Sequence, residues 1–288
     1  MKYVIVTNTI NRSHDLVERS LRASLNQNVP PIQVILIDQN KVTLELSYDI
    51  KSHPLFRLQR TDLKSVSAAR NNLVIPGNTD WIFFCDDDGY PCEDYSDKLE
   101  NIISGNDQIE ILAGSIVRDD NSEFYSLRHK KGGSLKYFRN TKNLMGSNFV
   151  IRVKTFLALG KFDENFGVGS YWGSSEETDL CWNAYFNKCE MEYFPELVVY
   201  HVPPFNETIN GGFSKAFYYG IGKGALVYKW LVKKREIKTS FELVEMFIVP
   251  FIQSIRAVFI LRPQLILTNI AAVLGRIIGF VKAVFVMK

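Results

Sequence analysis

The chain has 288 residues and a mass of 33.0 kDa, which suits two average domains or one large α/β domain with an additional segment. Hydrophobic residues make up 46% and charged residues 23%, so the composition excludes a disordered, collagen-like or disulfide-stapled chain. The net charge of +3 argues against a protein dedicated to nucleic acid, and we expect no nucleic-acid partner.

The charge is distributed unevenly along the chain. Residues 213–288 hold 12 Lys and Arg against 3 Asp and Glu, which leaves residues 1–212 with an acidic excess of about six. We therefore predict two regions with different tasks, a catalytic domain at 1–212 and a basic, apolar, helical region at 213–288.

The cysteines and the N-terminus favour a cytoplasmic protein. The four cysteines show no CxxC spacing, so a reduced chain is the simpler interpretation. The first residues turn polar too early for a signal peptide. The longest uncharged run of the tail, 263–275, has 13 residues, and a membrane span needs about 20.

Strands and helices alternate through the first part of the chain. Ser13 and Ser65 each precede an apolar periodic stretch and are candidate caps of the helices that follow. The pattern predicts strands at 3–6, 33–37, 56–58, 81–85 and 109–117, and the continuous apolar run at 3–6 is typical of a strand buried on both faces. This order predicts a mostly parallel sheet with right-handed crossovers.

The next part of the chain is less regular. Residues 129–143 are basic and aperiodic and predict a mobile loop, and the Gly- and Ser-rich residues 166–175 predict a second flexible loop. The remaining pattern predicts a strand at 149–153, a helix at 176–186, and short strands ending near 193 and 200.

Polar residues follow the predicted strands at the edge where parallel sheets bind ligands. They are Thr7 and Asn8, Asp38, and the triplet Asp86-Asp87-Asp88. Three adjacent carboxylates repel one another unless a cation lies among them, and oxygen ligands suit Mg²⁺ or Mn²⁺. A solvated acidic turn is the alternative, but the preceding buried strand and the nearby Arg70, which can bind phosphate bidentately, favour a metal–diphosphate site.

Further candidates lie later in the chain. Glu176 and Glu177 are neighbouring carboxylates, a pattern that raises one pKa and suits a general base, although acids are also common at helix N-termini. His201 follows a strand and is either structural or a ligand. Tyr171 and Trp172 lie in a Gly-rich loop, where they stack on a sugar ring or belong to the core.

In their order, these segments resemble the family 2 glycosyltransferases, which have the GT-A fold. The resemblance covers roughly residues 3–204. It rests on VIVTNTINRSHDLVERSLRASLNQ, VILIDQN, KSVSAARNNLV, WIFFCDDD, GSNFVIRVKTFLALGKFDENFG and SSEETDLCWNAYFNKCEMEYFPELVVYHVP. Each segment is weak alone, and the ordered set is specific.

The resemblance implies an inverting transfer of a sugar from a UDP-, dTDP- or GDP-sugar donor to a hydroxyl group, assisted by Mn²⁺ or Mg²⁺. By position, the nucleoside is expected at Thr7, Asn11 and Asp38. The diphosphate is expected at Arg70, the ribose at Asp86, and the metal at Asp88 with His201. Asp87 is a further donor-binding candidate, Glu177 or Glu176 is the candidate base, and Tyr171 and Trp172 are candidate acceptor-binding residues.

The sequence departs from the family pattern in three places. Glu177 stands where the family base is usually aspartate, so Glu176 remains a second candidate. Ser65 replaces a common glycine before the Ala-Arg-Asn helix, and Trp182 and Asn183 lie where an arginine is frequent.

The tail suggests a membrane-surface enzyme. Its helices have a wide apolar face and basic residues on the polar side, which suits a membrane interface, packing on the catalytic domain, or a homodimer. Five basic residues between 229 and 238 would be attracted to anionic lipid. We therefore expect a peripheral enzyme at the inner face of the cytoplasmic membrane, with a lipid-linked glycan acceptor of bacterial cell-surface polysaccharide assembly.

Two other functions remain open. A nucleotidyltransferase shares the metal and the α/β architecture, but it more typically has a Gly-rich loop after the first strand, and residues 7–12 contain no glycine. A non-catalytic sugar-nucleotide-binding subunit is the other alternative, because the base position is altered.

Overall fold

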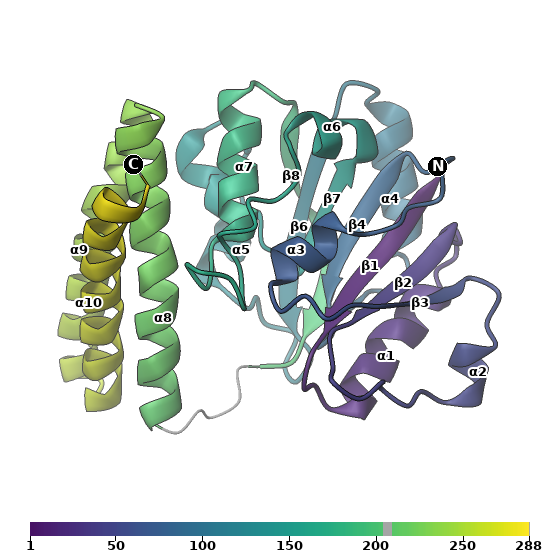
Figure 1. Ribbon diagram of the computed structural model, residues 1–288, viewed down its shortest axis with the longest axis horizontal. Helices are drawn as coiled ribbons and strands as arrows, with labels where there is room; N and C mark the ends of the chain where they lie inside the picture. Colours follow the sequence, from purple (N-terminus) through teal and green to yellow (C-terminus); the bar gives the residue numbers. More distant parts are fainter. Residues whose placement is uncertain (204–208, 288) are drawn as a thin grey trace. The chain divides into compact units, whose positions relative to one another are not determined.

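The computed structural model describes residues 1–203 and 209–287, which form two compact units. The sheet unit comprises Met1–Asp163 and Leu180–Pro203, and the helical unit comprises Glu164–Asp179 and the described part of Pro204–Lys288. Figure 1 shows the strands of the sheet unit and the long helices of the helical unit.

The sheet unit is built on a mixed sheet of eight strands. They are β1 (Tyr3–Thr9), β2 (Gln33–Asp38), β3 (Phe56–Arg60), β4 (Trp81–Asp86), β5 (Gly89–Pro91), β6 (Ile111–Arg118), β7 (Asn148–Arg152) and β8 (Met191–His201). Their order is β3-β2-β1-β4-β7-β6-β8-β5, and only β7 and β5 run antiparallel to their neighbours. This confirms the predicted α/β fold with a mostly parallel sheet. The two short strands expected near the end form one strand, β8.

Helices cover both faces of the sheet. One apolar cluster joins α1 (His14–Leu25) and α4 (Tyr95–Gly105) to one face, and a second joins α3 (Val66–Asn71), α6 (Val153–Ala158) and part of α7 (Glu176–Phe186) to the other. The small helix α2 (Tyr48–Lys51) follows β2. All seven residues of β1 are buried, which explains its continuous apolar run.

The two predicted serine caps differ. The Ser65 hydroxyl accepts a hydrogen bond from the backbone N–H of Ala68 at 3.3 Å, as its position before α3 suggested. Ser13 stands at the N-cap of α1, but its side chain makes no capping hydrogen bond. The helix begins at the predicted place without that contribution.

The prediction of a mobile loop at 129–143 is wrong. This segment contains α5 (Leu127–Lys131) and a 3-10 helix, η1 (Phe138–Asn143). His129 is buried, and its Nδ1 accepts a hydrogen bond from the backbone N–H of Ile116 at 3.0 Å. The Trp182 indole donates to the Thr141 hydroxyl at 3.2 Å. Because these partners come from other segments of the chain, local periodicity could not reveal that residues 129–143 are ordered.

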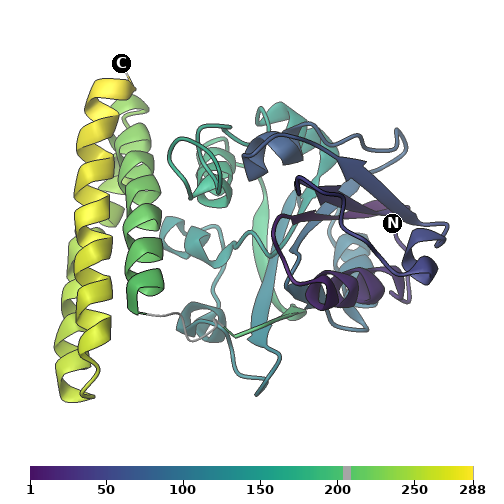
Figure 2. The ribbon, with the colours of Figure 1, turned by 60° about the horizontal axis from the view of Figure 1, so that its bottom comes forward.

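The helical unit contains three long helices, α8 (Ile209–Tyr228), α9 (Ser240–Phe259) and α10 (Pro263–Val286). A π-helical turn, Lys229–Lys233, extends α8, and a 3-10 turn, Ile237–Thr239, precedes α9. Figure 2 shows α8 and α10 side by side. A Cβ added at Gly224 would lie 2.0 Å from the Arg276 carbonyl oxygen, and one added at Gly279 would lie 2.0 Å from that of Ile221. Glycine therefore allows the two helix backbones to touch.

The expectation that the tail holds no segment of membrane-spanning length is wrong for α10. Among the described helices, this one has 24 residues and is apolar enough to cross a membrane by length and composition. Counting uncharged residues stopped at Arg276, whereas the helix continues to Val286.

Candidate active site

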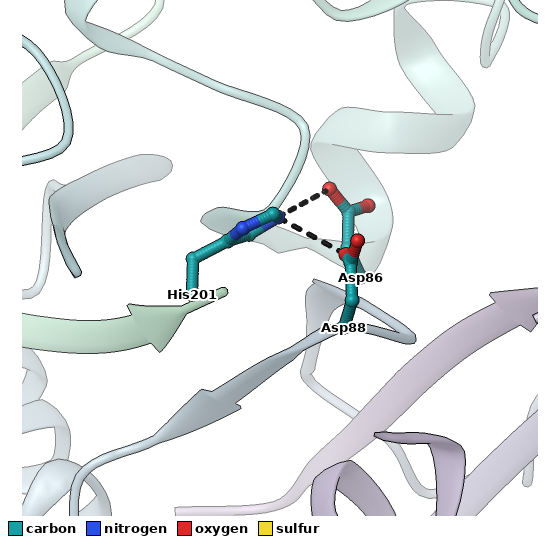
Figure 3. Close-up of side chains that lie close together, drawn as sticks. All are labelled: Asp86, Asp88 and His201. Atoms are coloured by element: carbon teal, nitrogen blue, oxygen red, sulfur yellow. Dashed lines mark ion pairs between the residues drawn. The ribbon is translucent and has the colours of Figure 1, made fainter. Parts of the chain in front are cut away.

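Three possible metal ligands meet where β4 and β8 end and β5 begins. Asp86 is the last residue of β4, and the turn through Asp88 leads into β5, whose Gly89 pairs with His201 at the end of β8. His201 Nε2 lies 3.1 Å from Asp88 Oδ1 and 4.0 Å from Asp86 Oδ2 (Figure 3). One ligand atom from each residue lies within 4.8 Å of the others. Asp88 and His201 therefore lie side by side, as the sequence predicts, and Asp86 lies next to both.

The imidazole of His201 is oriented for this role. Its Nδ1 lies 2.8 Å from the Val202 carbonyl oxygen, which only accepts hydrogen bonds, so Nδ1 carries a proton and Nε2 faces the carboxylates. Burial lowers the pKa of His201, but the hydrogen bond and charge of Asp88 and the charge of Asp86 outweigh it and raise the pKa to about 9. A cation bound here would replace the proton on Nε2. Two carboxylates and one imidazole fit Mn²⁺ or Mg²⁺.

Arg12 closes the other side of the acidic turn. Its Nε lies 2.9 Å from Asp87 Oδ1, and its NH1 lies 2.9 Å from Asp88 Oδ2. Burial raises the pKa of Asp87 to about 6, although Arg12 acts against this rise. For Asp88, burial is outweighed by His201 and Arg12, and the pKa is lowered. The sequence analysis gives no role to Arg12, although its place directly after Asn11 in the loop following β1 is a signal for one.

Arg70 is held rigidly beside Asp86. Its side chain is 3% exposed, and its guanidinium lies over the rings of Phe84 and Phe162 at 5.1 and 5.7 Å. Its Nε donates to Asn8 Oδ1 at 3.1 Å, and its NH2 lies 3.6 Å from Asp86 Oδ1. This packing fixes the plane of the guanidinium, which suits recognition of an oxyanion.

Asn8, rather than Thr7, contacts this cluster. Asn8 pairs with Asp86 in the parallel register of β1 and β4, and successive residues of a strand point to opposite faces. Thr7 therefore faces the other side of the sheet, where its buried hydroxyl has no hydrogen-bond partner among the described residues. The sequence predicts that both residues lie at the end of β1. The side of the sheet that each side chain faces is known only from the strand register.

Asp38 and Asn11 are linked through one side chain. Asp38 is fully buried, and its carboxylate accepts hydrogen bonds from the backbone N–H groups of Asn40 at 2.9 Å and Leu44 at 3.1 Å. Asn40 Oδ1 in turn accepts from the backbone N–H of Asn11 at 2.7 Å. Asn11 has a φ of 53°, a left-handed conformation that asparagine tolerates. The loops after β1 and β2 therefore form one connected structure.

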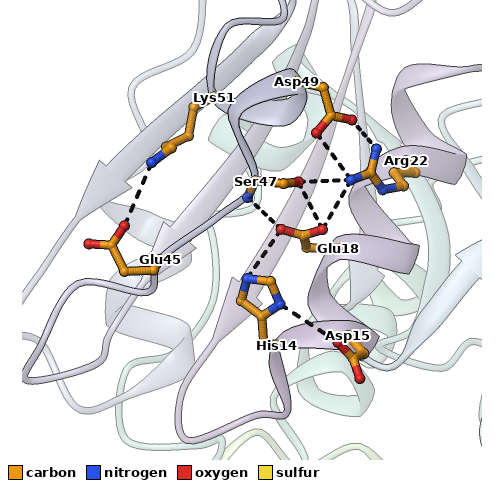
Figure 4. A network of polar contacts seen from close by, with 8 residues as sticks. All are labelled: His14, Asp15, Glu18, Arg22, Glu45, Ser47, Asp49 and Lys51. Atoms are coloured by element: carbon orange, nitrogen blue, oxygen red, sulfur yellow. Dashed lines mark hydrogen bonds and ion pairs between the residues drawn. The ribbon is translucent and has the colours of Figure 1, made fainter.

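A polar network on α1 fixes the segment after this loop (Figure 4). Glu18 accepts from the backbone N–H of Ser47 at 2.6 Å and from its hydroxyl at 2.9 Å. Arg22 pairs with Glu18 at 3.1 Å and also with Asp49. The network joins α1 to the start of α2, and so holds the chain that follows the predicted nucleoside-binding residue Asp38.

The candidate base and acceptor residues belong to the helical unit. Glu176 and Glu177 lie in the first turn of α7, directly after Ser175, whose φ is 76°. In the preceding loop, Trp172 is 2% exposed and Tyr171 is 55% exposed. The metal-ligand candidates and Arg70 belong to the sheet unit. The predicted residues therefore divide into two groups, one in each unit.

The family model of glycosyl transferase family 2 matches residues 4–163, which is more than half of the chain. The chain belongs to this family, as the ordered motifs indicated, and it is a glycosyltransferase. No curated protein matches the chain.

Solved structures of TarS from S. aureus share the fold. The TarS crystal structure superposes with a TM-score of 0.61 at 14% identity, covering 81% of this chain and 40% of TarS. TarS 1–349 and its complex with UDP-GlcNAc also give a TM-score of 0.61 at 14% identity and 81% coverage of this chain, with 66% and 67% of TarS 1–349 covered. The chain thus spans less than half of the longer TarS chain, and the likeness confirms the GT-A fold.

Proposed function

We propose that this glycosyltransferase moves a sugar from a nucleotide-diphosphate donor to a hydroxyl group of a glycan acceptor, with inversion and with a divalent cation. The observation that carries the proposal is the cluster of Asp86, Asp88 and His201 beside the buried guanidinium of Arg70. A cation and a fixed guanidinium are together suited to a diphosphate leaving group. The fold shared with a TarS structure that contains UDP-GlcNAc supports a nucleotide-sugar donor and makes UDP the first nucleotide to test.

Each group of the sheet unit has a defined part in donor binding. Asp86, Asp88 and His201 would hold Mn²⁺ or Mg²⁺, which when bound supplies positive charge to the departing diphosphate. Arg70 would bind the diphosphate oxygens, and Asp86 would also face the ribose. The nucleoside would be bound by Thr7, Asn11 and Asp38, with Asp87 a further donor-binding residue. Arg12 would orient the acidic turn through its contacts to Asp87 and Asp88.

Proton removal is assigned to the first turn of α7. Glu177 would accept the proton of the acceptor hydroxyl as that oxygen attacks the anomeric carbon from the side opposite the diphosphate, and Glu176 is the second candidate. Tyr171, with its exposed ring, would stack on the acceptor sugar. Trp172 would support it, since the two rings lie edge to face with centroids 4.7 Å apart.

We further propose a lipid-linked acceptor of bacterial cell-surface polysaccharide assembly, reached from the inner face of the cytoplasmic membrane. The turn between α9 and α10 is strongly apolar and exposed, with Phe259 at 81% and Leu261 at 87%. Two charged side chains of this helix pair are directed inward, since Glu242 pairs with Lys223 at 2.5 Å and Arg276 donates to the Met246 carbonyl oxygen at 2.6 Å, whereas Arg256, Arg262 and Lys282 are exposed. Burying such a surface in an interface is favourable.

Basic residues border the apolar helices and suit anionic headgroups. They are Lys233, Lys234, Arg235 and Lys238, while the fifth basic residue of this stretch, Lys229, pairs with Asp179. A homodimer is the second candidate for this face, favoured by the apolar groove between α9 and α10. The groove is lined by Phe247, Ile248, Pro250, Phe251, Ile270 and Leu274, among others.

A donor screen tests the proposed reaction. Purified protein with Mn²⁺ is mixed with UDP-, dTDP- and GDP-sugars, and the melting temperature and release of nucleotide diphosphate are measured. We expect one nucleotide series to stabilise the protein and to be hydrolysed slowly. Stabilisation with neither hydrolysis nor transfer would favour a sugar-nucleotide-binding subunit, and release of pyrophosphate from a nucleoside triphosphate would favour a nucleotidyltransferase.

A further inference from the structure

The segment that carries the candidate base forms part of the helical unit. Asp179, in the first turn of α7 and two residues after Glu177, is 4% exposed. Its carboxylate lies 2.8 Å from the Lys229 ammonium and accepts a hydrogen bond of 2.7 Å from the Trp230 indole. Lys229 and Trp230 belong to the π-helical turn that extends α8. The start of α7 is therefore joined to the C-terminal helices by a buried, charge-assisted contact.

The loop before α7 is attached to the same helices. The Ser174 hydroxyl donates to the Tyr219 carbonyl oxygen at 3.1 Å. A Cβ added at Gly222 would lie 2.1 Å from Ser174 Oγ and 2.9 Å from the Trp172 carbonyl oxygen, so α8 presents glycine where the loop backbone approaches. The Lys282 ammonium of α10 lies 5.0 Å from the centre of the Tyr171 ring.

These contacts matter because the loop has little regular structure of its own. Four residues in its last nine or so positions before α7, namely Gly167, Gly169, Gly173 and Ser175, have positive φ angles between 74° and 102°. Glycine adopts both signs of φ readily, so this backbone has many accessible paths and its contacts select one of them. The contacts to α8 and its π-helical turn fix the path of the loop. They thereby fix the first turn of α7, which bears the two glutamates.

We propose that Lys229 and Trp230 are positioning residues of the transfer reaction. They hold Asp179, and through it the first turn of α7, so that the candidate base stays in the geometry that proton removal requires. The inference rests on the proposed function, because it takes that turn as the source of the base. It gives the C-terminal helices a part in catalysis in addition to any contact with lipid.

A role in positioning predicts a particular kinetic effect. The proposed donor site consists of residues of the sheet unit, whereas Lys229 and Trp230 contact Asp179 within the helical unit. Loss of their contacts should therefore lower kcat and leave the donor KM unchanged. A displacement of about 1 Å in a reacting group lowers rates by up to about 100-fold.

The test compares four full-length variants in steady-state transfer assays with Mn²⁺. Trp230→Phe removes the indole N–H and keeps most of the ring, Lys229→Met removes the charge, and Lys229→Arg restores a charged donor. Lys223→Met is the matched control, because it removes another lysine–carboxylate pair of the helical unit, the one with Glu242.

We expect kcat to fall about 10- to 100-fold in Trp230→Phe and Lys229→Met, with donor KM within about twofold of the wild type. Lys229→Arg should recover most of the loss, and Lys223→Met should resemble the wild type. Turnover of Trp230→Phe and Lys229→Met equal to that of the control overturns the proposal. So does a loss of donor-induced thermal stabilisation in these variants, because the residues would then be generally structural.

Failure of the proposed function gives a different result. In that case the wild-type protein itself transfers no sugar and releases no nucleotide diphosphate from any donor, which overturns both proposals. An active wild type with equally active Trp230→Phe and Lys229→Met variants overturns the positioning role alone.

Discussion

The two units of this glycosyltransferase arrange their polar groups in opposite ways. In the sheet unit, charged side chains gather at the ends of buried strands, where strand register brings Asp86 and His201 together and helix α3 adds Arg70. In the helical unit, Glu242 and Arg276 are turned inward, the other basic side chains of α9 and α10 are exposed singly, and the exposed surface of these helices is largely apolar. We therefore propose that the sheet unit binds a charged ligand, and that the helical unit faces an apolar environment and supports the loop that carries the candidate base.

This contrast predicts that variants of the two units fail differently. Changes in the sheet unit should affect metal and donor binding. Changes in the helical unit should affect turnover or membrane recovery and leave donor binding intact.

The largest effect is expected from the metal ligands. Asp88→Asn removes one negative ligand, so transfer should fall about a thousandfold, because several kcal/mol of charge stabilisation are lost. Thermal stabilisation by Mn²⁺ should disappear as well. Asp120→Asn, which alters an exposed carboxylate paired with Arg118, is the control. Full metal-dependent activity in Asp88→Asn would show that the reaction does not use this cluster.

Arg70→Lys should have the next largest effect. A lysine lacks the planar fork that is packed over Phe84 and Phe162, so it cannot bind the diphosphate bidentately. Loss of such a charged hydrogen-bonded contact corresponds to about 2–3 kcal/mol, or about a 100-fold drop in kcat/KM. Titration of the nucleotide diphosphate by calorimetry measures the binding component. An unchanged affinity for the nucleotide diphosphate would show that Arg70 does not contact the donor.

Stability should respond to acid through the sheet unit. Burial lowers the pKa of His129 from 6.5 to about 4, so the unfolded chain binds a proton there more readily than the folded chain. The contribution of His129 is therefore present above pH 6.5 and is lost as the pH falls toward 4. Between pH 7 and pH 5 the free energy of unfolding should drop by about 2 kcal/mol from this group.

Urea denaturation at the two pH values, compared between the wild type and His129→Gln, isolates this contribution. The drop should be smaller in the variant by about the same 2 kcal/mol. An identical pH dependence in both proteins would mean that His129 titrates normally in the folded state.

The smallest effect is expected for membrane binding. Leu261→Asp places a charge in the apolar turn between α9 and α10, so recovery with anionic vesicles should fall by about two- to tenfold. Transfer to a soluble acceptor should not change. Val42→Asp, at an 82% exposed position of the sheet unit, is the control. Equal sedimentation of the two variants, together with dimerisation of the wild type alone, would assign the apolar face to a homodimer.

Much of the sheet unit followed from the sequence because its signals are local. Buried strands gave continuous apolar runs, and the polar residues after them, such as Asp86 and Asp88, lay at predictable ends. Side-chain direction was harder to infer, since Asn8 and Thr7 differ by one residue and face opposite sides of β1. Arg12 was missed because its partners lie 75 residues away.

The helical unit was less predictable because its determinants are non-local. The glycines of α8 and α10 are needed only because the two helices pack closely. A Cβ at Gly224, for example, would clash with the Arg276 carbonyl oxygen. Counting uncharged residues ended the apolar run of α10 at that same arginine, although its NH1 donates a hydrogen bond to the Met246 carbonyl oxygen within the helical unit. Likewise, the sequence indicates only that Asp179 is one of several acids at a helix N-terminus. Its contacts with Lys229 and Trp230 are visible only in the folded structure.

The central claim is that donor binding belongs to the sheet unit and proton removal to the helical unit. Glu177→Gln tests it most directly, with sugar transfer and Mn²⁺-dependent binding of the nucleotide sugar measured on the same protein. Transfer should be abolished while donor affinity stays within about twofold of the wild type. Retained transfer, or loss of donor binding together with activity, would contradict it.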